Sequence, residues 1–151
     1  MSIRYLQGEE LARTLGLRDL TDPQQGPHAM QTLLGLVHEA LAARWGCRRL
    51  LHRSPGLVSS ADNYDALGYP IDAAARATRY TRYVTPDHLL RTQTSAAIPA
   101  LLRGLSIDPP DDLLLICPGL VYRRDSIDRL HTAAPHQVDL WRIQRGRLGG
   151  V

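Results

Sequence analysis

The sequence predicts an α+β fold in which helices flank a largely antiparallel sheet. Its 151 residues, 44% of them hydrophobic, suit a single domain with a hydrophobic core. Helix-like and strand-like patterns are mixed along the chain, which disfavours a doubly wound parallel sheet. Two strand-like segments near the end of the chain, at 121–124 and 136–143, enclose a long polar loop, as in a hairpin.

The first third of the chain is predicted to be mainly helical. Residues 9–16 form a short helical pattern, and Gly16 is placed to stop it. The clearest helix is expected over 28–45, because apolar residues recur there with a helical period. These apolar residues are Met30, Leu33, Leu34, Val37, Leu41 and Trp45. A strand is expected at 48–52.

The middle of the chain has weaker patterns. Residues 58–70 are expected to be an irregular loop, and the alanine-rich segment 72–77 is expected to be a helical turn. Alternation at 80–84 predicts a strand, and 89–92 predicts a second, short one. A helix should follow from a cap at Thr94 or Ser95 to about Leu105, and the apolar run 113–117 should be a buried strand.

Composition narrows the classes of function. No apolar run approaches the roughly 20 residues of a membrane span, and the N-terminus has no secretion signature, so a cytoplasmic protein without membrane partners is expected. Cys47 and Cys117 are far apart and lack C-x-x-C spacing, which argues against a zinc site or a disulfide framework. The net charge of +3 permits a nucleotide or nucleic-acid partner without requiring one.

A dense group of polar residues follows the strand at 113–117. Arg123 is one of two neighbouring arginines that should point to opposite faces of their strand. Gln137 and Asp139 share one face of the returning strand, while His136 lies on the other. A guanidinium, an amide and a carboxylate on one face would suit a zwitterionic or phosphorylated ligand.

Three alternatives remain open from residue types alone. The first is a surface hairpin with solvated ion pairs. The second is a metal site at His131 or His136, although no third ligand has suitable spacing. The third is a glycosidase-like pair of carboxylates at Asp125 and Asp128.

Four ordered segments carry a resemblance to a known family. These are Leu-Arg-Thr-Gln-Thr-Ser at 90–95, Pro-Gly-Leu-Val-Tyr-Arg-Arg-Asp at 118–125, His-Thr at 131–132 and His-Gln-Val-Asp at 136–139. With Asp-Asn-Tyr-Asp-Ala-Leu upstream, they resemble the catalytic core of the phenylalanyl-tRNA synthetase α subunit, a class II aminoacyl-tRNA synthetase. The match covers roughly residues 60–141. It implies a class II synthetase-like antiparallel sheet flanked by helices, in incomplete form.

The resemblance implies a role for each matching position. Arg123 would hold the α-phosphate of ATP and the carboxylate of the substrate, as the central catalytic group. Asp125 and His131 would join it in binding ATP, with Mg²⁺ carried by the nucleotide. Ser95, Gln137 and Asp139 would bind the amino acid, and Asp139 stands where a glutamate is usual. These positions together define a site for an amino acid or a similar carboxylic acid.

The resemblance also implies an architecture. Residues 1–151 would be one domain, the N-terminal part of a class II catalytic core. The helix at about 28–45 would be motif 1, which builds the dimer interface, so a homodimer or synthetase-like oligomer is expected. Residues at about 113–143 would form motif 2. No motif 3, the glycine-rich segment with a second ATP-clamping arginine, is found after Trp141.

Two departures from the family pattern concern the ligand. Pro135 replaces a phenylalanine that stacks on adenine, and Arg79 replaces an aromatic that lines the phenylalanine pocket. Arg79 or Arg82 would favour a more polar or acidic ligand, unless both lie at the surface. We therefore expect part of an ATP-dependent synthetase-like protein that forms an aminoacyl-adenylate, with tRNA as one candidate acceptor and with this segment inactive alone. The alternative is a non-catalytic paralogue that binds an amino acid, a nucleotide or a partner protein.

Overall fold

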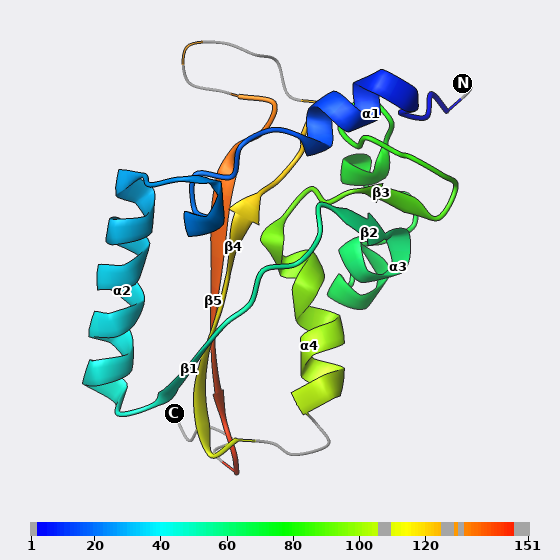
Figure 1. Cartoon of the computed structure of the whole chain (residues 1–151). Helices are drawn as coiled ribbons and strands as arrows, with labels where there is room; N and C mark the ends of the chain where they lie inside the picture. The colour runs from blue at the N-terminus through cyan, green and yellow to red at the C-terminus, as the bar shows by residue number, and fades with distance from the viewer. Residues whose placement is uncertain (1–2, 106–109, 125–128, 130–131, 147–151) are drawn as a thin grey trace.

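A three-stranded sheet forms the centre of the molecule. The computed structural model describes residues 3–105, 110–124, 129 and 132–146. β4 (Asp112–Leu120) lies between β1 (Arg48–Leu51) and β5 (His136–Gln144), parallel to β1 and antiparallel to β5 (Figure 1). The predicted α+β class is confirmed. In the described part of the chain the sheet is mixed, because the long connection from β1 to β4 lets them pair in parallel.

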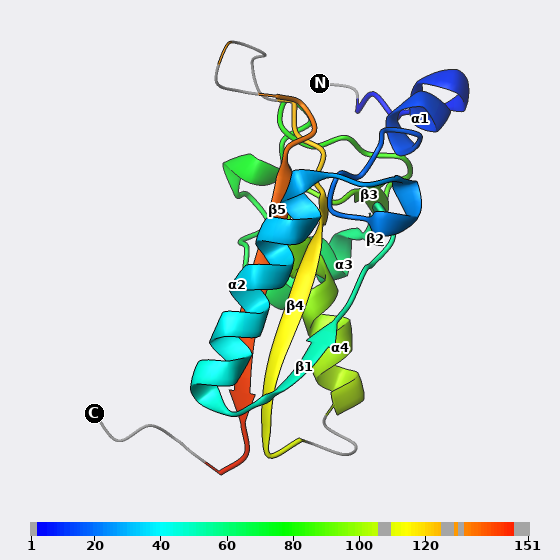
Figure 2. The same ribbon diagram turned by 60° about the vertical axis from the view of Figure 1, so that its left-hand side comes forward.

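Two helices cover opposite faces of this sheet, as Figures 1 and 2 show. α2 (Ala29–Trp45) packs on the β4 residues Leu114 and Ile116, whereas α4 (Ile98–Leu105) packs with the preceding 3-10 turn on the alternate residues of β4. Because both faces are covered, β4 is buried from its second residue to its last. No helix in the described ranges is long and apolar enough to cross a membrane.

A smaller unit lies beside the sheet. β2 (Leu57–Ser59) pairs antiparallel with β3 (His88–Leu90), and three short helical segments lie between them. These segments are α3 (Ser60–Asn63), η2 (Asp65–Leu67) and η3 (Ala74–Arg76). Tyr64 is fully buried, and its hydroxyl donates to the Ala75 carbonyl at 2.9 Å. The expected irregular loop at 58–70 is therefore wrong, because this buried tyrosine organises ordered turns around it.

The predicted helices are largely confirmed. α1 spans Gly8–Leu15, and α2 ends at Gly46, whose φ of +63° suits glycine. His28 lies just outside α2, and its ring accepts the Met30 N–H. Neither Thr94 nor Ser95 caps a helix, because both belong to the 3-10 turn η4 (Thr94–Ala97) that precedes α4.

Two predicted strands are wrong. Residues 80–84 make only an isolated bridge, between Tyr83 and Leu89. The threonine in the middle of this segment instead donates its hydroxyl to the Ala75 carbonyl. Residues 121–124 follow β4 without being a strand, although the N–H groups at 121 and 123 still donate across to 135 and 133.

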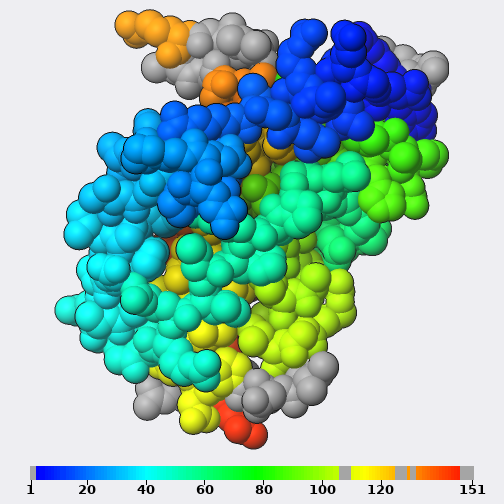
Figure 3. All heavy atoms as spheres, in the orientation of Figure 1, coloured from blue at the N-terminus to red at the C-terminus, as the bar shows by residue number. Residues whose placement is uncertain are grey.

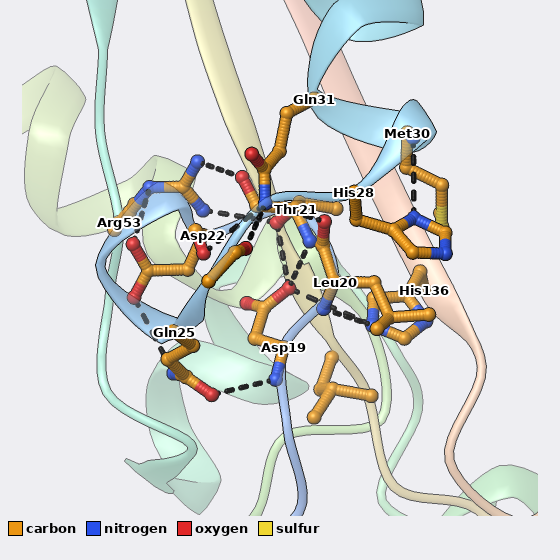
Figure 4. A network of polar contacts seen from close by, with 12 residues as sticks. Asp19, Leu20, Thr21, Asp22, Gln25, His28, Met30, Gln31, Arg53 and His136 are labelled. Atoms are coloured by element: carbon orange, nitrogen blue, oxygen red, sulfur yellow. Dashed lines mark hydrogen bonds and ion pairs between the residues drawn. The ribbon is translucent and has the colours of Figure 1, made fainter.

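The segment before α2, residues 18–28, crosses one end of the sheet, and we call it the strap. It includes a short 3-10 turn, η1 (Pro23–Gln25). Figure 3 shows the N-terminal part of the chain, in blue, lying across this end of the molecule. Figure 4 shows three side chains that fasten the strap: Arg53 to Thr21, His136 to the Leu20 N–H, and Gln31 to three strap carbonyls.

Candidate functional site

Four of the six predicted site residues line one pocket. Ser95 comes from η4, Arg123 from the segment after β4, and Gln137 and Asp139 from β5. The pocket has a volume of about 620 Å³, and we call it the main pocket. Its other lining residues are Leu67, Tyr69, Gln93, Val138 and Trp141. The predicted concave face with a cation, an amide and a carboxylate is thus present.

A second pocket adjoins the main pocket. It has a volume of about 450 Å³ and shares Tyr69, Gln93 and Arg123 with its neighbour, so we call it the side pocket. Tyr80, Thr92 and two small residues, Ala74 and Ala75, complete its lining. Arg123 therefore lies where the two pockets adjoin.

The register of β5 explains which side chains reach the main pocket. Gln137 lies opposite Gly119, and Asp139 lies opposite Cys117. Since side chains alternate along a strand, His136 faces away from these two and contacts the strap (Figure 4). The predicted separation holds for His136, whereas Val138, which was predicted to share its face, also lines the main pocket.

Arg123 is held by backbone groups on both sides. Its Nε donates to the Thr92 carbonyl at 3.0 Å, and its own carbonyl accepts from Arg82 Nη2 at 3.2 Å. A planar ligand group would therefore meet the two Nη nitrogens, which are the fork that suits a carboxylate or a phosphate. Arg82 supports the Arg123 backbone through this bond and lines neither pocket.

Asp139 lines the main pocket, and one of its carboxylate oxygens is buried. Among the described residues, its Oδ2 has no hydrogen-bond partner and almost no exposure to solvent. Burial, aided by the negative charge of Asp139, raises the pKa of Cys117 to about 11, so this thiol stays protonated at neutral pH. Cys117 is thus an inert buried residue.

Asn63 organises the opposite wall of the site. It is completely buried, donates to Thr92 Oγ1 at 2.9 Å, and accepts the Thr92 N–H at 3.1 Å. The backbone carbonyl of Asn63 also accepts a hydrogen bond from Gln93 Nε2 at 2.8 Å. Sequence reasoning missed Asn63 and Gln93 as site residues, whereas Tyr69 was one of several tyrosines that could provide either a stacking surface or core packing. The only signal was that Asn63 and Gln93 fall within segments that carry the family resemblance.

The remaining predicted residues have different outcomes. Asp125 and His131 lie outside the described residues. Arg79 lines neither pocket, because its guanidinium lies over the Tyr80 ring, 4.8 Å from the centroid. Pro135 pairs through its carbonyl with the Val121 N–H at 2.9 Å. Within the described ranges, no group of three or more His, Cys, Asp or Glu residues could hold a metal ion.

Comparisons with known proteins point to one family. The family model for the "tRNA synthetases class II core domain (F)" matches residues 34–147. Phenylalanine–tRNA ligase alpha subunits from Nostoc punctiforme and Synechocystis sp. are 33% and 41% identical over 114 and 93 residues. These matches cover 76% and 61% of this chain but 33% and 27% of the relatives. The chain spans about a third of the length of the curated relatives it matches.

A solved structure shares the fold. A pyrrolysyl tRNA synthetase from Desulfitobacterium hafniense, PylSc, aligns with a TM-score of 0.50 and 16% identity, over 73% of this chain and 37% of that one. The predicted resemblance to a class II synthetase core, and to the phenylalanyl-tRNA synthetase α subunit, is confirmed. The matched region contains Ser95, Arg123, Gln137 and Asp139. The chain belongs to the class II tRNA synthetase core-domain family (F).

Proposed function

We propose that this chain supplies the acid-binding and α-phosphate-binding half of an adenylate-forming site. The observation that supports this most is the pairing of opposite charges in the main pocket. Arg123 and Asp139 both line this pocket, and Oδ2 of Asp139 has no hydrogen-bond partner among the described residues. An amino acid carries the complementary pair, an ammonium group and a carboxylate, and would satisfy both.

The polar residues would divide the work as follows. Asp139 and the Gln137 amide would hold the amino group, with Ser95 beside it, while Arg123 would bind the carboxylate and the α-phosphate of ATP. The acid's carboxylate oxygen would attack the α-phosphorus in line, and pyrophosphate would leave. No side-chain nucleophile takes part, so the protein would contribute positioning and charge stabilisation through the fixed Arg123 guanidinium.

The nucleotide would bring its own metal. ATP supplies the activated phosphoryl group, and the described residues offer Arg123 but no cluster of metal ligands for it. Mg²⁺ would therefore bind to the phosphates instead of to a protein cage. Pro135 cannot provide an aromatic stack for adenine, so we expect affinity for ATP to depend on the phosphate contacts more than on the base.

A second copy of the chain is the proposed partner of α2. Leu33 and Leu36 on this helix are 63% and 62% exposed, which is unusual for leucines that serve only a monomer's core. The expected motif 1 role of this helix accounts for that exposure through a homodimer. For the second step, we propose that tRNA is the acceptor of the activated acid.

Calorimetry on the full-length protein, with ATP and a panel of amino acids, tests the proposed function. We expect Arg123→Ala to weaken ATP binding at least tenfold and to abolish pyrophosphate exchange, because the charge at the pocket junction is lost. Arg124→Ala is the matched control, since Arg124 lines neither pocket. Pyrophosphate exchange that survives Arg123→Ala at a near-wild-type rate would contradict the mechanism. Ligand binding without any exchange in the wild type would favour the non-catalytic alternative.

A further inference from the structure

Arg91 is a buried arginine that joins three separate segments of the chain. Its side chain is almost wholly buried, with 4% of the residue exposed. Its Nε donates to the Leu120 carbonyl at 2.7 Å, and its Nη1 donates to the carbonyl and hydroxyl of Ser54 at 3.0 and 2.7 Å. The buried guanidinium thus connects the segments at Ser54 and Leu120 through directional hydrogen bonds, which a lysine could not reproduce in full.

The backbone of Arg91 strengthens the same junction. Its N–H donates to the Gly56 carbonyl at 2.8 Å, and its carbonyl accepts the Tyr122 N–H at 2.9 Å. Residue 91 therefore bonds through both its main chain and its side chain to the segment that leads into Arg123. It also lies directly before Thr92 and Gln93, which line the side pocket.

Arg91 and Arg123 form a reciprocal pair, which we call the arginine brace. Arg91 Nε donates to Leu120, three residues before Arg123, and Arg123 Nε donates to Thr92, one residue after Arg91. Each guanidinium thus holds the backbone of the other's segment. The orientation of Arg123 in the main pocket depends on the position of the Thr92 carbonyl, which the brace fixes.

Gly119 makes room for the brace. A Cβ at this position would overlap Arg91 Nη2 and lie 3.2 Å from its Cζ, and Gly119 has a φ of +150° that other residues rarely adopt. The position faces Gln137 across the β4–β5 ladder. An otherwise continuous buried strand therefore carries a glycine at the one point where the Arg91 guanidinium passes over it.

We propose that Arg91 is the positioning residue of the candidate site. Glycine is required at position 119 because any Cβ there would overlap the Arg91 guanidinium. Arg91 lines neither the main pocket nor the side pocket; it sets the direction of the Arg123 guanidinium by fixing the two backbone segments that the brace connects. The proposal rests on the proposed function only in assigning a ligand to Arg123. The brace itself is a property of the residues described.

The arginine Nε–H signals in the NMR spectrum of the full-length protein test the brace directly. In Arg91→Met we expect the Arg123 Nε–H to exchange with solvent at least tenfold faster, because its carbonyl acceptor is no longer held in place. Arg123→Ala assigns the signal. The Arg142 Nε–H, which bonds Asp112 Oδ1 at 3.0 Å, is the internal control and should not change. Unchanged protection of the Arg123 signal would overturn the proposal.

Gly119→Ala provides a second and independent route. It keeps Arg91 but displaces its guanidinium, so the same loss of Arg123 protection is expected, with a fall in Tm on the order of 5 °C. In the Arg91→Met background the added methyl meets a smaller side chain, so its effect on Tm should shrink, leaving the part due to φ. If Gly119→Ala lowers Tm equally in both backgrounds, the proposed steric dependence of Arg91 on a glycine at position 119 is contradicted.

Binding measurements separate this proposal from the proposed function. If the wild type binds ATP, Arg91→Met should weaken that binding at least tenfold, and Arg91→Lys should restore part of it through one retained bond. Full ATP affinity in a folded Arg91→Met protein would overturn the positioning role. If the wild type binds no ATP, the proposed function fails, and the NMR exchange and the Tm comparison still decide the brace.

Discussion

β4 and β5 are paired strands of nine residues each, yet they do different work. β4 is buried along almost its whole length between α2 and α4, and its side chains serve the core. β5 is half-exposed: one face presents Gln137 and Asp139 to the main pocket, and the other presents His136 to the strap. The central strand of this sheet thus supplies core side chains, and its neighbour supplies side chains that line the main pocket.

The largest expected effect on stability comes from truncating a core side chain of the central strand, β4. Ile116→Ala removes a side chain with no exposed surface from the cluster under α2, so the free energy of unfolding should fall by about 2–5 kcal/mol. Leu140→Ala is the matched control, because Leu140 is the cross-strand partner of Ile116 but is 38% exposed. Urea denaturation measures both. Equal losses of unfolding free energy in the two variants would contradict the view that β4 contributes more to the core than β5.

His136 should have an intermediate effect that depends on pH. Its Nε2 accepts the Leu20 N–H at 2.9 Å, so His136→Ala should lower the free energy of unfolding by about 1 kcal/mol, whereas His136→Gln can keep an acceptor. Burial chiefly lowers the pKa of His136; nearby His28 lowers it further, and Asp19 opposes the shift. The folded state therefore prefers the neutral ring.

The sign of the pH dependence follows from that preference. Stability from neutral His136 is present above its unfolded pKa of about 6.5 and is lost as pH falls from there toward the folded pKa. Denaturation at pH 7.5 and pH 5.0 should show a smaller difference in His136→Gln than in the wild type. The pKa of His38 is also lowered, but His38 is present in both proteins and cancels. Identical pH dependence in the two proteins would rule out His136 as the titrating group.

The smallest expected effect on stability, combined with a large effect on binding, belongs to Asp139. Asp139→Asn removes a charge whose Oδ2 has no partner among the described residues, so the free energy of unfolding should change by less than about 0.5 kcal/mol or rise. Amino-acid binding should weaken at least tenfold in calorimetry. Asp72→Asn, at an exposed position outside both pockets, is the control. A strongly destabilised Asp139→Asn protein would show that β5 also has a core role.

Local patterns in the sequence predicted much of this structure. The period of apolar residues in α2 and the glycine after it were sufficient for that helix, and the period of two placed Gln137 and Asp139 on one face. The alternation at 80–84 was misleading, because the Thr81 side chain bonds the Ala75 carbonyl and the segment makes only an isolated bridge. Apolar periodicity predicted α2 even though Leu33 and Val37 of that pattern are exposed, whereas a short alternation was not sufficient for a strand at 80–84.

The features that could not be predicted depend on contacts between distant segments. Asn63 reaches Thr92, and Arg91 reaches Ser54 and Leu120, all across intervals of about thirty residues or more. The parallel pairing of β1 with β4 is equally remote in sequence. Nothing in the local composition around these residues distinguishes them from ordinary polar positions, so the family resemblance located the site without explaining how it is held.

Gly119 and Arg91 also constrain how this sequence can change over time. A side chain at position 119 collides with the Arg91 guanidinium, so the steric part of its cost falls when position 91 is smaller, while the strain from the φ of +150° remains. A larger residue at 119 is therefore less costly once the arginine has been lost, and the arginine does not fit again while that residue remains. The order in which positions 91 and 119 change therefore affects whether the packing of Arg91 over position 119 is kept.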